Sequence, residues 1–247
     1  MAEIRRIKIT IEYDGSRYAG WQIQPNGDTI QAEIENALFA VTGERSRVHG
    51  AGRTDAGVHA EAQVAHFDTQ SSVPDEGFAL ALNAFLPEDI RVTEAETVPD
   101  DFHARFSAKG KVYAYRIFNR RTASAILRST TTSVKKALDV GEMREAAETF
   151  LGRHDFSAFC AANTAVEDKV RTIESLSIEA EGPLITITVE GDGFLYNMVR
   201  IMAGTLVDAG LGKLGPEDVK AIIESKDRLR ASATMSASGL ILKRVKY

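Results

Sequence analysis

The first part of the chain shows two hydrophobic periods, which predict a strand followed by a helix. Apolar and polar side chains alternate over residues 7–13, which is the two-residue period of a half-buried strand. From Ile30 to Val41 the apolar residues recur at the spacing of one helix face. Asp28 and Gln31 resemble a capping box at the start of this helix, and Gly43 is placed to end it.

The rest of the chain predicts further strands and helices in two similar halves. The expected strands lie near residues 47–50, 62–67, 91–98, 111–118, 172–178, 184–190 and 240–245. The expected helices lie near 75–85 and 142–151, with one opening near Leu195 and one beginning at Pro216. This order fits an α+β class with antiparallel halves of the ferredoxin-like (RRM-like) kind. We place the division so that residues 1–106 form an N-terminal half and residues 107–247 a C-terminal half.

The composition is that of an ordinary globular protein. Of the 247 residues, 44% are hydrophobic and 26% are charged, which argues against disorder over the whole chain. The single cysteine, Cys160, excludes an internal disulfide and a cysteine-rich metal centre. No apolar run approaches the ~20 residues that span a bilayer, and the N-terminus is too poor in apolar residues for a signal peptide. We therefore expect a soluble, cytoplasmic protein.

Charge is segregated along the chain, although the formal net charge is −5. Residues 102–138 contain nine Lys and Arg and no Asp or Glu, whereas residues 75–101 contain eight acidic side chains. A polyanion such as RNA responds to the local field more than to the total charge. On charge alone, a solvated basic face is the simpler interpretation of the acid-free stretch.

The loop from Gly50 to Ala60 is the stretch that most strongly suggests chemistry. Its closely spaced glycines allow unusual backbone angles and close approach of a ligand. Arg53 and Asp55 lie two residues apart, and a neighbouring guanidinium lowers the pKa of a carboxyl group. An ionised Asp55 suits a nucleophile or an electrostatic stabiliser and does not suit a general acid. From the residues alone, a plain turn with Asp55 capping backbone amides and Arg53 solvated remains open.

Other kinds of site find little support in the sequence. The loop lacks the Gly-Lys-Ser/Thr ending of a P-loop, so nucleoside triphosphate binding is disfavoured. His49, His59 and His66 do not match a familiar metal-ligand spacing. Cys160 has no paired histidine motif and is interpreted as a small buried thiol.

Five ordered blocks of the chain resemble the TruA family of tRNA pseudouridine synthases. They are Gly52-Arg53-Thr54-Asp55-Ala56-Gly57-Val58-His59, residues 98–108 (VPDDFHARFSA), Tyr113-Ala114-Tyr115-Arg116-Ile117, residues 154–159 (HDFSAF) and residues 193–200 (GFLYNMVR). Ser238-Gly239-Leu240 also fits the family's pattern. Because the blocks follow the family's order over nearly the whole chain, the resemblance is specific.

The resemblance implies a fold, an activity and a set of site residues. The fold is that of pseudouridine synthases, with the two halves joined through a largely antiparallel sheet and a central active-site cleft. The activity is isomerisation of uridine to pseudouridine at positions 38, 39 and/or 40, in the anticodon stem-loop of tRNA. By the matching motifs Asp55 is the catalytic aspartate, and Arg53 and Arg200 line the site and ion-pair with it. Tyr113 matches the residue that stacks on the target base.

The resemblance also implies that no metal or organic cofactor is used. It implies a homodimer, and we expect the dimer interface in the C-terminal half. The reaction itself is redox-neutral and adds no atoms, which agrees with the absence of a cofactor motif from the sequence. A carboxylate could attack the base or the sugar, or promote a glycal intermediate, and the sequence does not choose among these routes.

Two other functions remain compatible with individual residues. An RNA-binding protein without catalysis would share the basic stretch and the tyrosines but would not need Asp55. A glycoside hydrolase usually needs two carboxylates about 5–9.5 Å apart, whereas this loop offers one beside an arginine. Taken singly, Tyr113 could be a strand tyrosine in the core, and Arg200 a cation on a helix surface.

Overall fold

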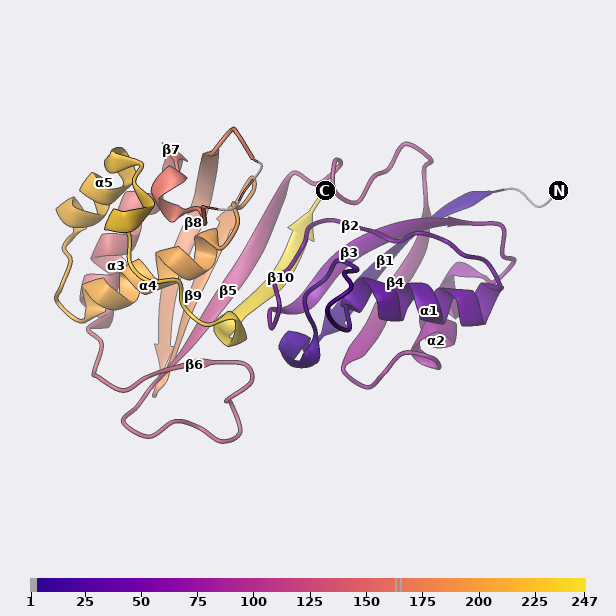
Figure 1. The fold of residues 1–247 in the computed structure, drawn as a ribbon, viewed down its shortest axis with the longest axis horizontal. Coiled ribbons are helices and arrows are strands. Elements are labelled where there is room, and N and C mark those ends of the chain that lie inside the picture. The colour runs from indigo at the N-terminus through magenta and orange to yellow at the C-terminus, as the bar shows by residue number, and fades with distance from the viewer. Residues whose placement is uncertain (1–3, 163, 165) are drawn as a thin grey trace. The chain divides into compact units, whose positions relative to one another are not determined.

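The chain divides into two compact units (Figure 1). The computed structural model describes residues 4–162, 164 and 166–247. The first unit contains the chain up to Lys109 together with Leu242–Tyr247, and the second contains Gly110–Ile241. The division between residues 106 and 107 into an N-terminal and a C-terminal half stays a prediction.

The first unit has a four-stranded antiparallel arrangement with the ferredoxin-like order. Its elements are β1 (Arg5–Tyr13), α1 (Ile30–Thr42), β2 (His49–Gly50), β3 (His59–Thr69), α2 (Asp75–Asn83) and β4 (Ile90–Val98). Strand β1 pairs antiparallel with both β3 and β4, and β2 pairs antiparallel with β3. The order β4-β1-β3-β2, with a helix between β1 and β2 and another between β3 and β4, is the split βαβ arrangement. The last strand, β10 (Leu240–Lys246), lies next to β3.

One face of the first-unit sheet forms the core of that unit. Ile7, Ile9 and Ile11 of β1 are fully buried, as the alternating pattern predicts. Phe67 of β3 meets Phe78 of α2 edge to face, with ring centroids 5.7 Å apart. Because neighbouring residues of a strand point to opposite faces, His66 projects from the face opposite to that covered by α2.

The ends of α1 agree with the sequence at one terminus and differ at the other. Gly43 ends the helix in the left-handed region, with φ of 73°, as predicted. The N-cap is Thr29, whose side chain accepts a hydrogen bond from the Ala32 N–H, so the predicted Asp28–Gln31 capping box is wrong. Thr29 takes this role because its hydroxyl lies one residue nearer to the exposed amides of the first turn.

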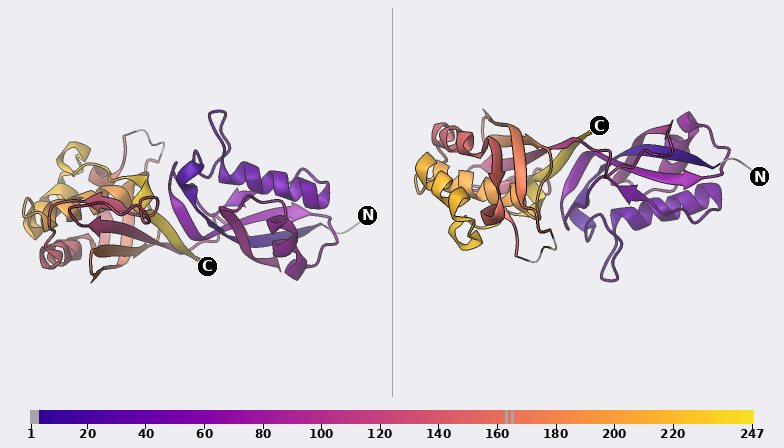
Figure 2. Two further views of the ribbon diagram at one scale, coloured as in Figure 1. Left: turned by 90° about the horizontal axis from the view of Figure 1, so that it is seen from below. Right: turned by 90° about the horizontal axis from the view of Figure 1, so that it is seen from above.

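The second unit also mixes strands with helices, but three strands lie between its first two helices, α3 and α4. Its elements are β5 (Gly110–Asn119), β6 (Thr132–Val134), α3 (Val140–Ala147), β7 (Gly152–Asp155), β8 (Val170–Glu181), β9 (Leu184–Gly191), α4 (Met198–Gly210) and α5 (Pro216–Ser225). The strand order is β5-β9-β8-β7 with antiparallel pairing, and β6 adds to β5 in parallel. Figure 2 shows α3, α4 and α5 gathered beside these strands.

These observations confirm the predicted α+β class with a largely antiparallel sheet. Helix α4 begins at Met198 and not near Leu195, because Asn197 adopts a left-handed conformation with φ of 62°. The short strands β6 and β7 were not predicted, since three or four residues carry too little hydrophobic pattern. The helix predicted to run to Leu151 ends at Ala147 and continues as a 3-10 turn over Glu148–Phe150.

The buried His66 makes the stability of the first unit depend on pH. Its imidazole is 3% exposed, and its Nδ1 accepts a hydrogen bond from the Ala104 N–H at 3.1 Å. Burial, with the nearby His103 and Arg6, lowers the pKa of His66 to about 4 from its usual 6.5. Between these values the unfolded chain binds a proton that the folded chain does not. The contribution of His66 to stability is therefore complete above pH 6.5 and is lost as the pH falls toward 4.

We predict that lowering the pH from 7 to 4.5 reduces the free energy of unfolding more in the parent than in a His66→Gln variant. A single histidine contributes a slope of at most about 1.4 kcal/mol per pH unit. Urea unfolding at several pH values measures this slope, and the glutamine amide oxygen can still accept from Ala104. Identical pH profiles for the two proteins would show that His66 does not titrate in this way.

Candidate active site

The loop that carries Asp55 joins β2 to β3 in the first unit and is anchored at several points. The Ala51 N–H donates to the Val64 carbonyl at 2.7 Å, and the Gln63 side-chain amide donates to the Gly52 carbonyl at 3.0 Å. These bonds hold the first half of the loop against β3. A loop fixed through its backbone holds the points from which its side chains project.

Thr54 is the buried centre of this loop. It lies between Arg53, which is exposed, and Asp55, which is half-buried. The Thr54 hydroxyl hydrogen-bonds to the Tyr13 hydroxyl at 2.8 Å in a buried position at the end of β1. Burial raises the pKa of Tyr13 well above its usual value, so the phenol stays protonated and neutral. The loop thus buries its neutral hydroxyl, leaves Arg53 exposed and keeps Asp55 half-buried.

A second segment, Tyr18–Trp21, holds the loop from the other side. The Trp21 N–H donates to the Thr54 carbonyl at 3.0 Å, and the Gly57 N–H donates to the Tyr18 carbonyl at 3.3 Å. Gly20 has φ of 102°, and a Cβ atom there would lie 2.7 Å from the Thr54 carbonyl oxygen. Glycine is therefore required at this position by both its backbone angle and its contact.

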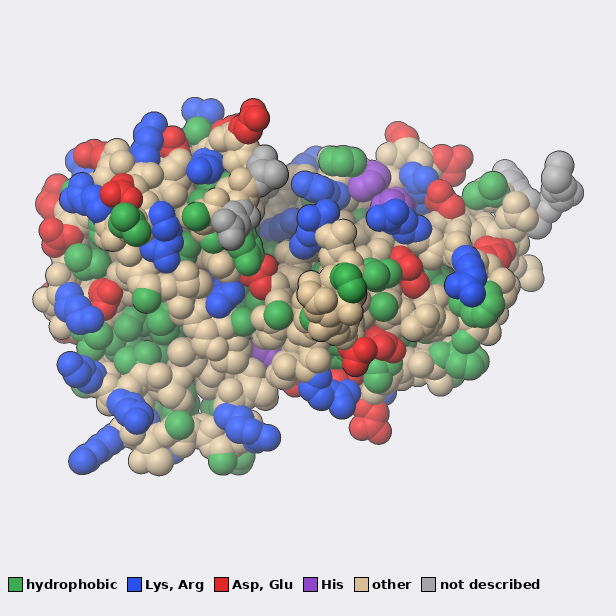
Figure 3. All heavy atoms as spheres, in the orientation of Figure 1, with side chains coloured by type: hydrophobic (Ala, Val, Ile, Leu, Met, Phe, Trp, Pro, Cys, Tyr) green, Lys and Arg blue, Asp and Glu red, His purple; other side chains and the backbone are tan. Residues whose placement is uncertain are grey.

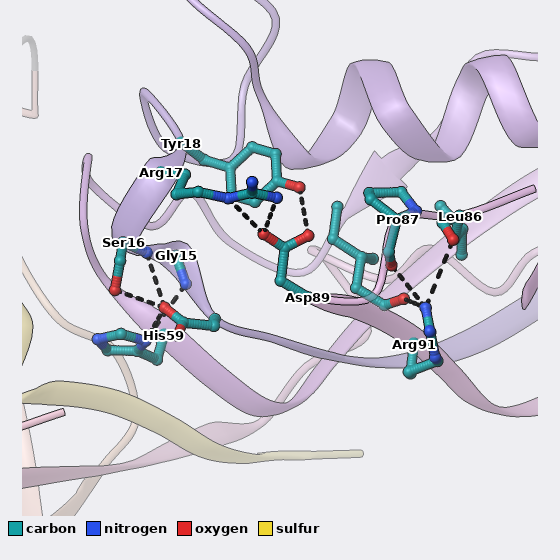
Figure 4. A network of polar contacts seen from close by, with 11 residues as sticks. Gly15, Ser16, Arg17, Tyr18, His59, Leu86, Pro87, Asp89 and Arg91 are labelled. Atoms are coloured by element: carbon teal, nitrogen blue, oxygen red, sulfur yellow. Dashed lines mark hydrogen bonds and ion pairs between the residues drawn. The ribbon is translucent and has the colours of Figure 1, made fainter. Parts of the chain in front are cut away.

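Asp89 fixes the segment that holds the loop. The Tyr18 hydroxyl donates to one Asp89 oxygen at 2.7 Å, and the Arg17 guanidinium donates to the other at 2.6 Å (Figure 4). At the neighbouring turn, the Gly15 N–H donates to His59 Nδ1 at 3.2 Å. Burial raises the pKa of Asp14 in that turn, but its hydrogen bonds from Ser16 outweigh burial, and the pKa is lowered overall. Asp89, which lies outside the loop, therefore supports the loop indirectly by holding Arg17 and Tyr18.

Sequence reasoning missed this supporting set. Tyr13 was predicted only as a strand residue, and Gly20 and Trp21 were not singled out. The signal available was a glycine directly before the single tryptophan of the chain, between a predicted strand and a predicted helix. That pattern indicates a close backbone approach, but it does not say which loop is approached.

Tyr113 lies on β5 in the second unit, with only 9% of its surface exposed. The ring of Phe194 meets it edge to face, with centroids 5.1 Å apart and planes at 82°. Tyr115, two residues along the strand, is fully buried, and its hydroxyl contacts the Thr132 hydroxyl at 2.6 Å and the Ser236 carbonyl at 2.8 Å. Burial raises the pKa of Tyr115 to about 12. Tyr115 is thus tied into the second unit through its hydroxyl.

Arg200 lies in the first turn of α4 and is half-buried. Its Nη1 donates to the Asn197 side-chain oxygen at 2.7 Å, and its Nε donates to the Met235 carbonyl at 2.8 Å. The Met235 N–H returns a hydrogen bond to the Arg200 carbonyl at 3.2 Å. The guanidinium is therefore held in a defined position on a helix whose other residues are mostly buried and apolar.

The predicted site residues fall into two groups. Arg53 and Asp55 share one anchored loop of the first unit, whereas Tyr113 and Arg200 belong to the second unit. Among the described residues, no three His, Cys, Asp or Glu side chains are grouped as ligands for a metal ion. Across the described part of the chain, no helix is long and apolar enough to cross a membrane.

Comparison with known proteins identifies relatives along almost the whole chain. A family model described as tRNA pseudouridine synthase matches residues 9–107 and 146–247. The loop and Arg200 lie inside these stretches, and Tyr113 lies between them. A solved archaeal box H/ACA Nop10–Cbf5 complex aligns with 96% of this chain and 47% of its own, at 11% identity and a TM-score of 0.41.

Full-length relatives are much more similar. The tRNA pseudouridine synthase A 2 of Clostridium perfringens is 49% identical over 244 residues, which covers 99% of this chain and all of the relative. The tRNA pseudouridine synthase A of Bacillus subtilis is 47% identical over 244 residues, covering 98% of this chain and 99% of the relative. Because both the family model and these relatives extend over most of the sequence, the chain belongs to the tRNA pseudouridine synthase family, whose members are isomerases that act on tRNA.

Proposed function

We propose that the chain isomerises uridine to pseudouridine at positions 38, 39 and/or 40 in the anticodon stem-loop of tRNA. The observation that supports this most is the anchored loop, which leaves Asp55 half-buried beside the inward-turned Thr54. A carboxylate whose backbone is held by two strands and a second segment can meet a reacting base or sugar without reorganising. The membership of the tRNA pseudouridine synthase family gives the reaction class.

The reaction needs a group that helps break one bond and allows its fragments to recombine. The C1′–N1 bond breaks and a C1′–C5 bond forms, while C5 loses a proton and N1 gains one. No electrons enter or leave. Asp55 would act as the nucleophile or charge stabiliser, and base attack, sugar attack and a glycal route all conserve atoms in this way.

Arg53 and Arg200 are proposed to line the site and pair with Asp55, which would keep the carboxylate ionised. Tyr113 is proposed to stack on the target base after it leaves the RNA stem. Extruding a base costs a few kcal/mol, and stacking returns about 1–3 kcal/mol. The fixed guanidinium of Arg200, held by Asn197 and Met235, supports a role in positioning charge.

We further propose that the anticodon arm is the part of the tRNA that enters the site, that the enzyme works as a homodimer, and that it acts in the cytoplasm. The stretch 102–138 supports contact with a polyanion, because it contains nine Lys and Arg residues and no Asp or Glu. Sedimentation of the purified chain with and without tRNA tests the dimer.

The first prediction from this proposal concerns the carboxylate. Asp55→Asn keeps the size of the side chain and removes its charge, so pseudouridine formation on unmodified tRNA should fall below detection while tRNA binding survives. Glu76→Gln, at an exposed carboxylate in the first turn of α2, is the matched control and should keep the parent rate. A near-parent rate for Asp55→Asn would disprove its catalytic role.

The second prediction concerns the Tyr13–Thr54 hydrogen bond that anchors the loop. Tyr13→Phe keeps the ring but removes the hydroxyl that holds Thr54, so the single-turnover rate should fall while tRNA affinity changes little. Thr69→Val is a control, because it removes the hydroxyl bond of Thr69 to Glu44, at the opposite end of β3. Both variants should lose about 1 kcal/mol of stability. Equal rates in the two variants would mean that the Tyr13 hydroxyl only stabilises the fold.

The third prediction separates two roles of Tyr113. If the ring stacks on the base, Tyr113→Ala should weaken binding of tRNA by ~1–3 kcal/mol and Tyr113→Phe should not. If the hydroxyl moves a proton when the C5 hydrogen is released, Tyr113→Phe should bind normally and turn over slowly. Melting temperatures of both variants control for loss of the Phe194 contact. Unchanged affinity and rate in the Ala variant would leave Tyr113 as a core residue.

A further inference from the structure

Four aromatic rings of the first unit form a continuous row outside the Asp55 loop. His49 of β2 stacks on His66 of β3, with centroids 5.1 Å apart and planes at 22°. His66 meets His103 at 4.6 Å, and His103 meets Phe106 at 4.4 Å. We call His49, His66, His103 and Phe106 the histidine row. It lies on the sheet face opposite to α2, because Phe67, the neighbour of His66, packs against Phe78 of that helix.

Both ends of the histidine row are open to solvent. His49 is exposed, and Phe106 is 77% exposed, while His66 between them is 3% exposed. Phe106 sits on a well-ordered turn: the Ser107 N–H donates to the His103 carbonyl at 2.8 Å, and the His103 N–H donates to the Ser107 hydroxyl at 3.0 Å. An exposed phenylalanine on a fixed turn, in contact with other rings, offers a preformed aromatic face.

Arginine supplies charge beside the row, and His66 and His103 do not. Burial, with nearby cations, lowers the pKa of His103 as well as that of His66, so both rings are neutral at pH 7. The Arg105 guanidinium lies 5.7 Å from the centre of the Phe106 ring and is exposed. Arg6 and Lys8, from β1, form ion pairs with Asp68 and Glu96. Figure 3 shows histidine side chains next to Lys and Arg side chains on the surface of this unit.

We propose that the histidine row and Arg105 form a second RNA-contact surface, which stacks an unpaired base of the tRNA on Phe106 and contacts the adjoining phosphate through Arg105. The proposal rests on the proposed function, since it takes tRNA as the partner. An exposed ring combined with a guanidinium is the arrangement that binds single-stranded nucleotides in a sequence-tolerant way. The ion pair with Arg6 neutralises the charge of Asp68, which would otherwise repel a phosphate.

The surface should affect the affinity for tRNA and should not affect the rate of the chemical step. Phe106→Ala should raise the Kd for unmodified tRNA about five- to 150-fold, the range that corresponds to loss of one stacked base. Phe106→Tyr keeps the ring and should stay close to the parent. Arg105→Gln should flatten the slope of log K against log salt by about one phosphate contact, which is about 0.7–0.9. Rates at saturating tRNA should match the parent in all three variants.

Phe85→Ala provides the matched control, because Phe85 is 59% exposed just beyond the end of α2 and lies outside the row. Its tRNA affinity should not change. Binding is measured both in the parent background and in Asp55→Asn, which separates contact from turnover. If the parent binds and isomerises tRNA and Phe106→Ala binds tRNA with the same affinity, the proposed RNA-contact surface is wrong and the proposed function stands.

Two further outcomes are diagnostic. If Phe106→Ala changes the sedimentation coefficient of the protein without RNA, the row is a protein–protein contact and the proposal is wrong. If the parent neither binds nor isomerises tRNA, the proposed function fails, and the surface fails with it. Weaker binding by Phe106→Ala with normal sedimentation and normal saturated rate supports the RNA contact.

Discussion

The buried hydrogen bond between Tyr13 and Thr54 is the interaction on which the account of the site depends. It joins the end of β1 to the middle of the loop between β2 and β3, and it explains how a loop with several glycines keeps a fixed shape. Thr54 is buried, whereas Arg53 beside it is exposed and Asp55 is half-buried. The constraint is reinforced by Gly20 and Trp21, whose backbone approaches the Thr54 carbonyl too closely for any side chain at position 20.

The second unit uses the same strategy for a cation. Arg200 is fixed by a side-chain oxygen and a main-chain carbonyl, on a helix packed so tightly that a Cβ at Gly204 would lie 2.2 Å from the Ala233 carbonyl oxygen. Within the second unit, the Arg200 guanidinium therefore has a defined position that does not depend on a long flexible segment. Under the proposed function, a preorganised charge of this kind would help to stabilise the transition state.

Much of the fold could be predicted from the sequence, because hydrophobic periodicity and glycine placement act locally. The β1 alternation and the Gly43 terminus of α1 are examples. The parts that failed depend on distant contacts or on single backbone angles. Thr29 replaced the expected cap, and the left-handed Asn197 delayed the start of α4. For the site, the motif indicated Asp55, but the sequence could not show that Tyr13, 41 residues away, hydrogen-bonds to Thr54. The same limit applied to the histidine row, because His49, His66 and the turn that carries His103 and Phe106 lie far apart in the sequence.

The central claim is that the Tyr13–Thr54 hydrogen bond positions the loop that carries Asp55. A double-mutant cycle on the single-turnover rate of pseudouridine formation tests it most directly, with Tyr13→Phe, Thr54→Val and the double variant measured on the same tRNA. If the two hydroxyls act through one bond, the double variant should be no slower than the slower single variant. Rate losses that multiply in the double variant would show two independent effects and would contradict the account.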